Sequence, residues 1–421
     1  MLPASPAGKR FTIFSWSLFD FANTAYSVIV VTVIYPRYFQ AHVAGGRNWL
    51  WGAAVSLSMI CAAALSPPLG AAADASHNKK LYLFIFTFAS ALCTALLFYV
   101  GDGMLIPGIL FFVIANIGFE GGLVFYDAFL PSLTSERSYG RVSGYGFAMG
   151  YAGALAVLGI VIALLPDPAD PGYLFFVRLS FVVAAAFFLF FSLPMFLFVP
   201  EPRPAARVRP AGGALRAGMS QAARTFRVLF VRNEHPAIAR FLFAFFIYND
   251  GILTVISFAA IFAAQTLRMD DKAIIIFFAV VQTSAILGSV VFGFVTDAIG
   301  PKRTISLTLL IWIAICIGAF FVNSVAVFYA VALAAGIAIG SSQSASRSLM
   351  ALLTPKEHEA EFFGFYDGLC GKASAVIGPL VYGLVADLTN QRAAALAIGL
   401  FFVAGLTLLQ RVPDRRAEVV K

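Results

Sequence analysis

Long apolar runs separated by short polar links dominate the sequence. A helix needs about 20 apolar residues to cross the ~30 Å hydrocarbon core of a bilayer. A membrane β-barrel would instead show short segments that alternate between apolar and polar residues. The pattern therefore predicts an all-α membrane protein with twelve transmembrane helices. The runs lie near residues 13–39, 49–70, 81–100, 106–130, 144–165, 173–199, 237–263, 273–295, 304–322, 326–350, 364–386 and 393–411.

The overall composition points to the same class of protein. Hydrophobic residues make up 60% of the 421 residues and charged residues only 12%, whereas soluble domains carry about 25% charged residues. This balance argues against a disordered chain, a coiled coil or a soluble enzyme. The first apolar run continues well past the length of a signal-peptide core, so we expect it to be retained as the first transmembrane helix.

A basic link at residues 201–236 divides the runs into two sets of six. It predicts an N-terminal six-helix bundle over 1–200, a cytoplasmic linker over 201–236 and a C-terminal six-helix bundle with a short tail over 237–421. Within the linker, residues 214–232 carry apolar and arginine positions at helical spacing. We expect a short amphipathic helix on the membrane surface, where arginine favours anionic lipid.

The distribution of positive charge predicts the orientation in the membrane. Most of the 29 Lys and Arg residues fall on one side if the N-terminus is cytoplasmic, as expected from the preference of positive charge for cytoplasmic loops. An even number of spans then places both termini in the cytoplasm. The formal net charge of +8 is thus an orientation signal, and we expect no nucleic-acid partner.

The two sets of spans carry related loops. GAAADASHNKK at 70–80 and GFVTDAIGPKR at 293–303 each join the second and third spans of their set, and 134–148 overlays 354–368 between the fourth and fifth spans. Each repeat keeps its side of the membrane, which predicts two parallel bundles, an arrangement typical of transporters. The residues shared by the first pair of loops are Gly70, Asp74, Lys79 and Lys80 in one copy and Gly293, Asp297, Lys302 and Arg303 in the other.

This loop pattern, G-x-x-x-D-x-x-x-x-[KR]-[KR], resembles the signature of the major facilitator superfamily. The first copy departs from the signature at His77 and Asn78. The resemblance implies that Asp74 contacts the start of the eleventh helix near 363–364 and that Asp297 contacts the fifth helix near 143–144. These contacts would close the cytoplasmic side and break when the bundles rock. The alternative is that each aspartate only caps its loop.

Ionisable residues inside the spans are candidates for function, because charge is costly at membrane depth. We expect Lys372 to pair with Asp20 or Asp250. Two explanations of these ionisable residues remain open. They bind substrate or protons in a central cavity, or they form a structural polar cluster that fixes helix packing. The candidates for substrate or proton binding are Asp20, Asn23, Tyr26, Glu120, Tyr126, Asn249, Asp250, Gln343 and Lys372. The candidates for gating, besides the loop residues, are Asp127, Arg141, Arg347 and Glu361.

Longer stretches resemble the family called the unknown major facilitator family, which includes the autophagy-related vacuolar amino-acid effluxers of fungi. Its pattern is visible in WSLFDFANTAYS at 16–27, FYDAFLPS at 125–132, QSASRSLMALLTPK at 343–356 and EFFGFYDGLCGKASA at 361–375. Asp127 stands where the family usually has Asn, which puts the transfer of function at that position in doubt. The resemblance implies a secondary transporter that exports amino acids, here as a bacterial-type permease of the inner or plasma membrane.

The sequence therefore predicts a transporter that works by alternating access on a small solute, with protons coupled through Asp20, Glu120 or Asp250. We expect a monomer in the lipid bilayer, with no enzymatic activity, cofactor or metal. The alternative is a membrane sensor or assembly partner that keeps the transporter fold without transporting. Such a protein would bind its partner through the linker at 201–236 and show no flux.

Overall fold

The protein is described by a computed structural model that covers residues 6–167, 169–201, 214–232, 234–269 and 271–414. Every regular element in this part of the chain is helical. The first six spans contain α1 (Pro6–Tyr26) continued by π-helical Ser27–Val33, α2 (Tyr35–Tyr38) and π-helical Phe39–Val43, α3 (Asn48–Ser76), α4 (Lys79–Leu96) with a 3-10 turn (Leu97–Tyr99), α5 (Leu105–Asp127), α6 (Leu130–Leu133) with a 3-10 turn (Glu136–Ser138), α7 (Tyr139–Leu164) and α8 (Tyr173–Phe198).

The linker and the last six spans follow the same plan. The linker helix α9 (Ala214–Phe226) runs into π-helical Arg227–Val231. The remaining helices are α10 (Pro236–Thr266), α11 (Asp271–Ile299), α12 (Pro301–Phe321), α13 (Val325–Leu353), α14 (Glu359–Phe363) continued by π-helical Gly364–Gly371, α15 (Ile377–Leu388) and α16 (Gln391–Gln410).

The eleventh span, predicted over 364–386 with a kink at Pro379, is interrupted upstream of that proline. Eleven helices in the described residues are long and apolar enough to cross a membrane, and Ile377–Leu388 is apolar but shorter. The chain is π-helical over Gly364–Gly371, bends at 374–376 and resumes as α15. Pro379 in the first turn of α15 could not continue a preceding helix, because proline lacks the N–H and clashes with the turn before it. The eleventh crossing is thus formed by two helical pieces.

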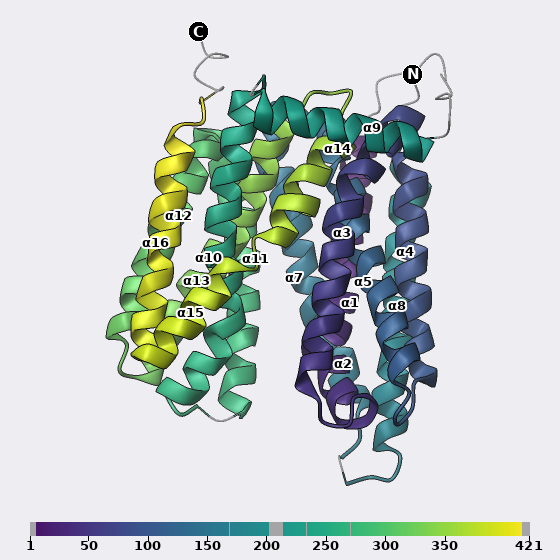
Figure 1. Ribbon diagram of the computed structural model, residues 1–421, viewed down its shortest axis with the longest axis vertical. Coiled ribbons are helices and arrows are strands. Elements are labelled where there is room, and N and C mark those ends of the chain that lie inside the picture. The colour runs from purple at the N-terminus through teal and green to yellow at the C-terminus, as the bar shows by residue number, and fades with distance from the viewer. Residues whose placement is uncertain (1–5, 168, 202–213, 233, 270, 415–421) are drawn as a thin grey trace.

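The spans pack in two groups that stand side by side (Figure 1). In the first group α1 packs against α7 and α8, and α4 packs against α5 and α8. In the second group α10 and α12 pack against α16, and α11 and α12 pack against α13. The groups touch through α7 with α11 and α13, and through α3 with α14 and the π-helical segment Gly364–Gly371. Each of these elements begins or ends at one of the repeated loops, 70–80, 293–303, 134–148 and 354–368.

Contact between the groups is tight at the side where α1 begins and α16 ends, which we call the terminal side (Figure 1). A Cβ added to Gly144 of α7 would collide with the carbonyl of Ser289 in α11, and one added to Gly70 of α3 would collide with the carbonyl of Ala360. Only glycine allows two helix backbones to approach this closely. Towards the opposite side, a Cβ at Gly159 of α7 would meet nothing within 4 Å.

Candidate functional site

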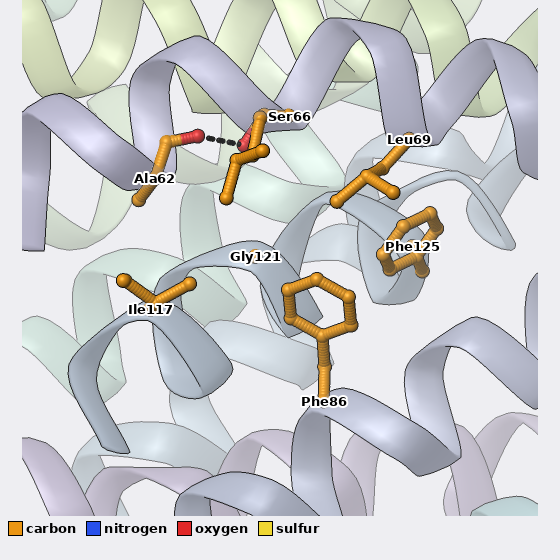
Figure 2. A pocket seen from close by; sticks show the side chains of 8 residues that line it. Ala62, Ser66, Leu69, Phe86, Ile117, Gly121 and Phe125 are labelled. Atoms are coloured by element: carbon orange, nitrogen blue, oxygen red, sulfur yellow. Dashed lines mark hydrogen bonds between the residues drawn. The ribbon is translucent and has the colours of Figure 1, made fainter. Parts of the chain in front are cut away.

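A small apolar pocket lies between α3, α4 and α5 (Figure 2). It leaves no space for even a water-sized molecule, so it does not hold a solute. The hydroxyl of Ser66, which lines the pocket, donates to the carbonyl of Ala62 at 2.6 Å. The pocket contains none of the predicted binding residues, so the candidate site must lie elsewhere. Its lining is Ala62, Leu65, Ser66, Leu69, Phe86, Ile117, Gly121 and Phe125.

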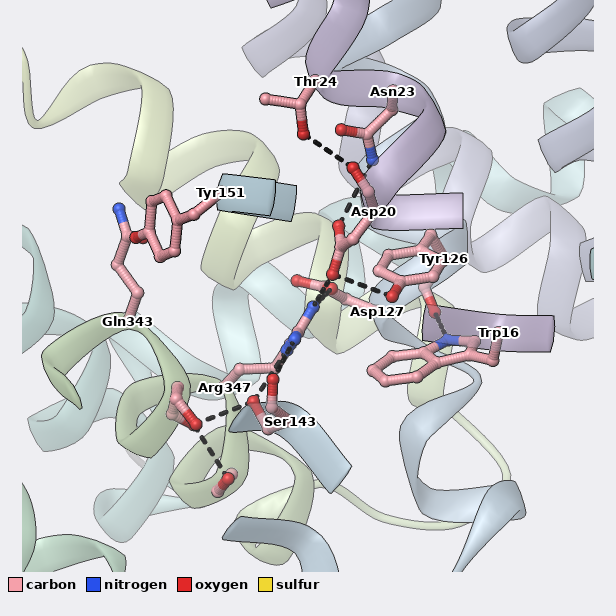
Figure 3. A network of polar contacts seen from close by, with 12 residues as sticks. Trp16, Asp20, Asn23, Thr24, Tyr126, Asp127, Ser143, Tyr151, Gln343 and Arg347 are labelled. Carbon is pink, nitrogen blue, oxygen red and sulfur yellow. Dashed lines mark hydrogen bonds and ion pairs between the residues drawn. The ribbon is translucent and has the colours of Figure 1, made fainter. Parts of the chain in front are cut away.

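The candidate site is centred on Arg347 of α13, whose side chain crosses from the second group of spans into the first (Figure 3). Its Nη1 donates to Asp127 Oδ1 at 2.8 Å and lies 3.4 Å from Asp20 Oδ2. Its Nε and Nη2 donate to the hydroxyl and the carbonyl of Ser143 at 2.9 and 2.8 Å. Arg347 is 1% exposed, so these partners replace water around a fully buried guanidinium. We call Arg347, Asp20, Asp127 and Ser143 the arginine network.

Aromatic rings enclose the arginine network. The guanidinium carbon lies 4.0 Å from the ring centroid of Phe147 and 5.0 Å from that of Trp16, within range of cation–π attraction. The hydroxyl of Tyr126 donates to Asp20 Oδ2 at 2.8 Å. A Cβ at Gly146 would lie 2.7 Å from Arg347 and from Asp20. Glycine at this position leaves the space that the ion pair occupies.

Lys372 has different partners from those expected. It forms an ion pair with Glu120 of α5, and its Nζ lies 3.4 Å from Asp367 Oδ2. The prediction of Asp20 or Asp250 as its partner is wrong. The π-helical segment Gly364–Gly371 packs against α3 and α5, so the lysine that follows it reaches α5. We call Lys372, Glu120 and Asp367 the lysine network, which also joins the two groups of spans.

Asp250 and Asn249 of α10 form a third, separate cluster. Both carboxylate oxygens of Asp250 accept from the N–H of Gly378 at 2.9 Å. Asn249 donates to the hydroxyl of Ser374 at 2.6 Å. These side chains therefore bind the break in the eleventh span, and Asp250 satisfies an N–H at the start of α15, where a negative charge is favourable.

The other predicted binding residues lie in different places. Asn23 donates to Asp20 Oδ1 at 3.3 Å and so contacts the arginine network. Tyr26 donates to Asn116 at 3.3 Å inside the first group of spans. Gln343 of α13 accepts from Tyr151 of α7 at 2.6 Å and bridges the two groups. The nine predicted binding residues thus lie in several clusters.

The repeated loops place each aspartate against the opposite group of spans. Asp74 accepts from the N–H groups of Ala360 at 3.2 Å and Glu361 at 2.8 Å, which we call the first aspartate contact. Asp297 accepts from the N–H of Gly140 at 2.9 Å, which we call the second aspartate contact. Both lie about one helical turn before the positions expected near 363–364 and 143–144, because α14 and α7 begin earlier than the predicted spans.

The basic residues of the two loops behave differently from each other. Lys79 forms an ion pair with Glu359 across the groups and lies 3.4 Å from Asp74. Lys80 donates to the carbonyl of Val199 in its own group at 2.7 Å. In the second loop, Lys302 donates to the carbonyls of Gln410 and Val412 at 3.0 and 2.5 Å, and Arg303 pairs with Asp414 at 3.1 Å. Arg141 pairs with Asp297 at 3.3 Å.

Sequence reasoning did not select several residues that the structure brings into these contacts. Asp367 had a usable signal, because it is one of the few ionisable residues inside the predicted spans and lies close to Lys372 in the sequence, but it was not placed among the candidates for binding or gating. Ser143 and Tyr151 are ordinary polar residues of a glycine-rich span, and Glu359 lies in a polar link. Nothing in the local sequence distinguishes these three, because their partners lie about 200 or more positions away.

Comparison with known proteins identifies the family of this chain. Residues 52–420 match the family described as vacuole effluxer Atg22 like. The chain belongs to this family. Over 98% of its length it is 30% identical to an uncharacterized MFS-type transporter, YxiO, of Bacillus subtilis, of which 97% is covered. Autophagy-related protein 22 of Yarrowia lipolytica is 24% identical over 80% of this chain and 70% of the relative.

Solved structures show the same fold at low sequence identity. The human organic anion transporter MFSD10 superposes with a TM-score of 0.79 at 16% identity, covering 97% of this chain and all of that one (100%). The proton:xylose symporter XylE superposes with a TM-score of 0.74 at 14% identity, covering 98% and 97%. The chain thus has the fold of the major facilitator superfamily, and its relatives are transporters.

Proposed function

We propose that this member of the family exports a small solute with an amino group, such as a neutral amino acid, in exchange for protons. The observation that supports it is that two ion networks, around Arg347 and Lys372, each join the two groups of spans. We treat 1–200 and 237–421 as the moving bundles and 201–236 as their linker. The terminal side faces the cytoplasm of a cell membrane, in keeping with its basic loops.

The arrangement corresponds to a state closed on the terminal side. The two aspartate contacts and both ion networks lie within or beside the tight contact zone of α3, α7, α11 and α13. For the bundles to rock and open this side, each contact must separate. Loop residues of both copies would then act as a gate, with Asp74, Asp297, Arg141 and Glu361 in direct contact.

The charge count of the two networks favours a proton or an ammonium group as the missing partner. Among the described residues, the carboxylates of Asp20, Asp127, Glu120 and Asp367 form ion pairs with two cations, Arg347 and Lys372. With all six groups ionised, the two networks together carry a net charge of about −2, which is costly away from water. Two protons, or a proton and an ammonium group, would balance it. Amide groups such as those of Asn249 and Gln343 are suited to the solute carboxylate.

Reconstituted protein tests this proposal. Vesicles with an imposed pH gradient should move radiolabelled neutral amino acids, and the Asp20→Asn, Glu120→Gln and Asp250→Asn variants should reduce the dependence of flux on the gradient. Asp102→Asn is the matched control, because Asp102 is an exposed acid on the opposite side that pairs with His42. Unchanged proton-coupled flux in all three variants would overturn proton coupling at these residues. The absence of flux with any solute would favour the non-transporting sensor.

A further inference from the structure

The linker helix α9 presents three different faces. One stripe of buried residues, Gly218, Ala222, Thr225 and Leu229, recurs every three or four positions and defines the face turned inwards. The next stripe around the helix contains Met219, Phe226 and Phe230, which are 58, 47 and 41% exposed. The third stripe carries the exposed residues Arg216, Ser220, Arg224 and Arg227. A helix with one buried, one exposed apolar and one basic face is suited to a boundary between protein, lipid and water.

The inward face seats α9 on α3. A Cβ at Gly218 would collide with the carbonyl of Pro68 and with Ala72, so the helices touch at backbone distance. Pro68 and Ala72 lie roughly 12 and 6 Å, at ~1.5 Å per residue, from the end of α3 at Ser76. The 29 residues of α3 extend over roughly 44 Å, about 7 Å beyond a ~30 Å hydrocarbon core at each end, so a core centred on α3 would end near this level. Figure 1 shows α9 lying across the terminal side of the spans.

The position of α9 also connects it to both groups of spans. Its inward face rests on α3, which carries Asp74 of the first aspartate contact. Phe226 and Phe230 approach the ring of Phe365 in the second group, with centroids 6.5 and 6.4 Å apart. Phe365 lies four residues after Glu361, which donates its N–H to Asp74. Holding α9 in place therefore holds the two sides of the first aspartate contact together.

The charge of the outer face identifies what covers it. Residues 214–232 contain Arg216, Arg224, Arg227 and Arg232 and no acidic residue. Arg224 donates to Gln221 on the same helix, and Arg232 lies 3.6 Å from Glu234. Arginines beside an apolar stripe at this depth match the phosphates and acyl chains of a single kind of surface, an anionic bilayer leaflet.

We propose that α9 is an anionic-lipid-binding helix that clamps the terminal side closed. Acyl chains cover Met219 and Phe230, and acidic headgroups bind Arg216, Arg224 and Arg227. Lipid bound in this way holds α9 on α3 and favours the first aspartate contact. Loss of anionic lipid frees the helix and favours opening of this side. The proposal does not depend on which solute is carried.

Fluorescence quenching tests the lipid preference. Met219→Trp places a reporter on the apolar stripe, and the same chain without this substitution corrects for the four native tryptophans. The vesicles contain phosphatidylcholine and phosphatidylglycerol, and either lipid can carry the brominated chains. Quenching by brominated phosphatidylglycerol should correspond to an enrichment of that lipid beside the reporter of about fivefold or more over its share of the vesicle. Inorganic phosphate should leave this preference unchanged. Equal quenching by the two brominated lipids would overturn the proposal.

Charge variants separate a lipid-binding face from general basicity. The preference should disappear in R216Q/R224Q/R227Q and persist in R216K/R224K/R227K, since a headgroup responds to charge. The matched control is K9Q/R10Q/R137Q, which removes three exposed charges from the same side and should keep the preference. A preference that survives the first variant, or is lost equally in the control, would contradict the assignment.

Hydrogen exchange tests the clamp itself. In wild-type protein, anionic vesicles should slow amide exchange at 66–76 and 359–365 several-fold relative to vesicles of phosphatidylcholine alone. R216Q/R224Q/R227Q should abolish that difference, and the matched control should retain it. Quenching preference without any change in exchange would show that α9 binds lipid but does not clamp the terminal side, and would overturn the proposal as stated.

Discussion

The two aspartate contacts come from the same repeated loop, yet they are built differently. Each aspartate crosses to the opposite group of spans and accepts backbone N–H groups there. At the first contact Lys79 also crosses, to Glu359. At the second, the corresponding Lys302 stays within its own group and binds the carbonyls of Gln410, at the end of α16, and Val412, just beyond it. The duplicated pattern conserves the aspartate contact, whereas the basic residues depend on what each bundle places beside them.

This difference suggests that the two contacts contribute unequally to closure. The first combines two N–H donors with ion pairs and lies under α9. At the second, Asp297 accepts from the N–H of Gly140 and pairs with Arg141, whose side chain is 45% exposed, where an ion pair contributes little. The following predictions use spin labels at Ser135→Cys and Lys356→Cys, with the native cysteines replaced, to measure the distance across the terminal side.

The largest expected effect comes from removing each aspartate. Asp74→Ala deletes an acceptor of two N–H groups and should shift the closed equilibrium by about 3 kcal/mol, at roughly 1.5 kcal/mol for each hydrogen bond to a charged group. Asp297→Ala should shift it less, because the ion pair that it removes is with the exposed side chain of Arg141. The label distance should lengthen more in Asp74→Ala. Equal shifts, or a larger shift in Asp297→Ala, would contradict the ranking of the two contacts.

Close glycine packing should affect both contacts alike. Gly70→Ala and Gly144→Ala each place a methyl group against a backbone carbonyl of the other group, and overpacking of this kind costs about 1–3 kcal/mol. Both variants should populate the open distance to a similar degree. Gly159→Ala is the control, since nothing lies within 4 Å of the added methyl, and its distance distribution should match the wild type.

The basic residues should separate the two contacts. Lys79→Gln removes a partly buried cross-group ion pair and should favour opening by about 1 kcal/mol. Lys302→Gln removes contacts within one group and should leave the label distance unchanged, although it can lower thermal stability. If Lys302→Gln opened the terminal side as much as Lys79→Gln, the asymmetry described above would be false.

The smallest effect should be a dependence on pH at the first contact alone. The hydrogen bond to Glu361 raises the pKa of His358 above its ordinary value. The negative charge of Asp74 on the opposite group also raises this pKa, so protonated His358 stabilises the contact below about pH 6.5, and this stabilisation is lost as pH rises through the raised pKa. The closed population should fall over that range by less than 1 kcal/mol. His358→Gln should abolish the dependence; a dependence that persists would assign it to another group.

The sequence predicted the elements better than their partners. Apolar length located the spans, and the repeated loops located Asp74 and Asp297, whose contacts lie one turn from the expected positions. The eleventh span was predicted as one helix kinked at Pro379, but hydropathy does not register the π-helical segment or the bend at 374–376. The partner of Lys372 was wrong, because depth along a helix does not say which neighbour the side chain faces.

The sequence by itself determined the class of protein, the approximate spans and the internal duplication. These follow from local properties, since crossing a bilayer requires a fixed length of apolar helix and every backbone polar group bonded within it. Tertiary structure alone decided that Arg347 meets Asp20 and Asp127, that Lys372 meets Glu120, and that α9 rests on α3. These pairs depend on how separate helices pack and rotate, which no single stretch of sequence specifies.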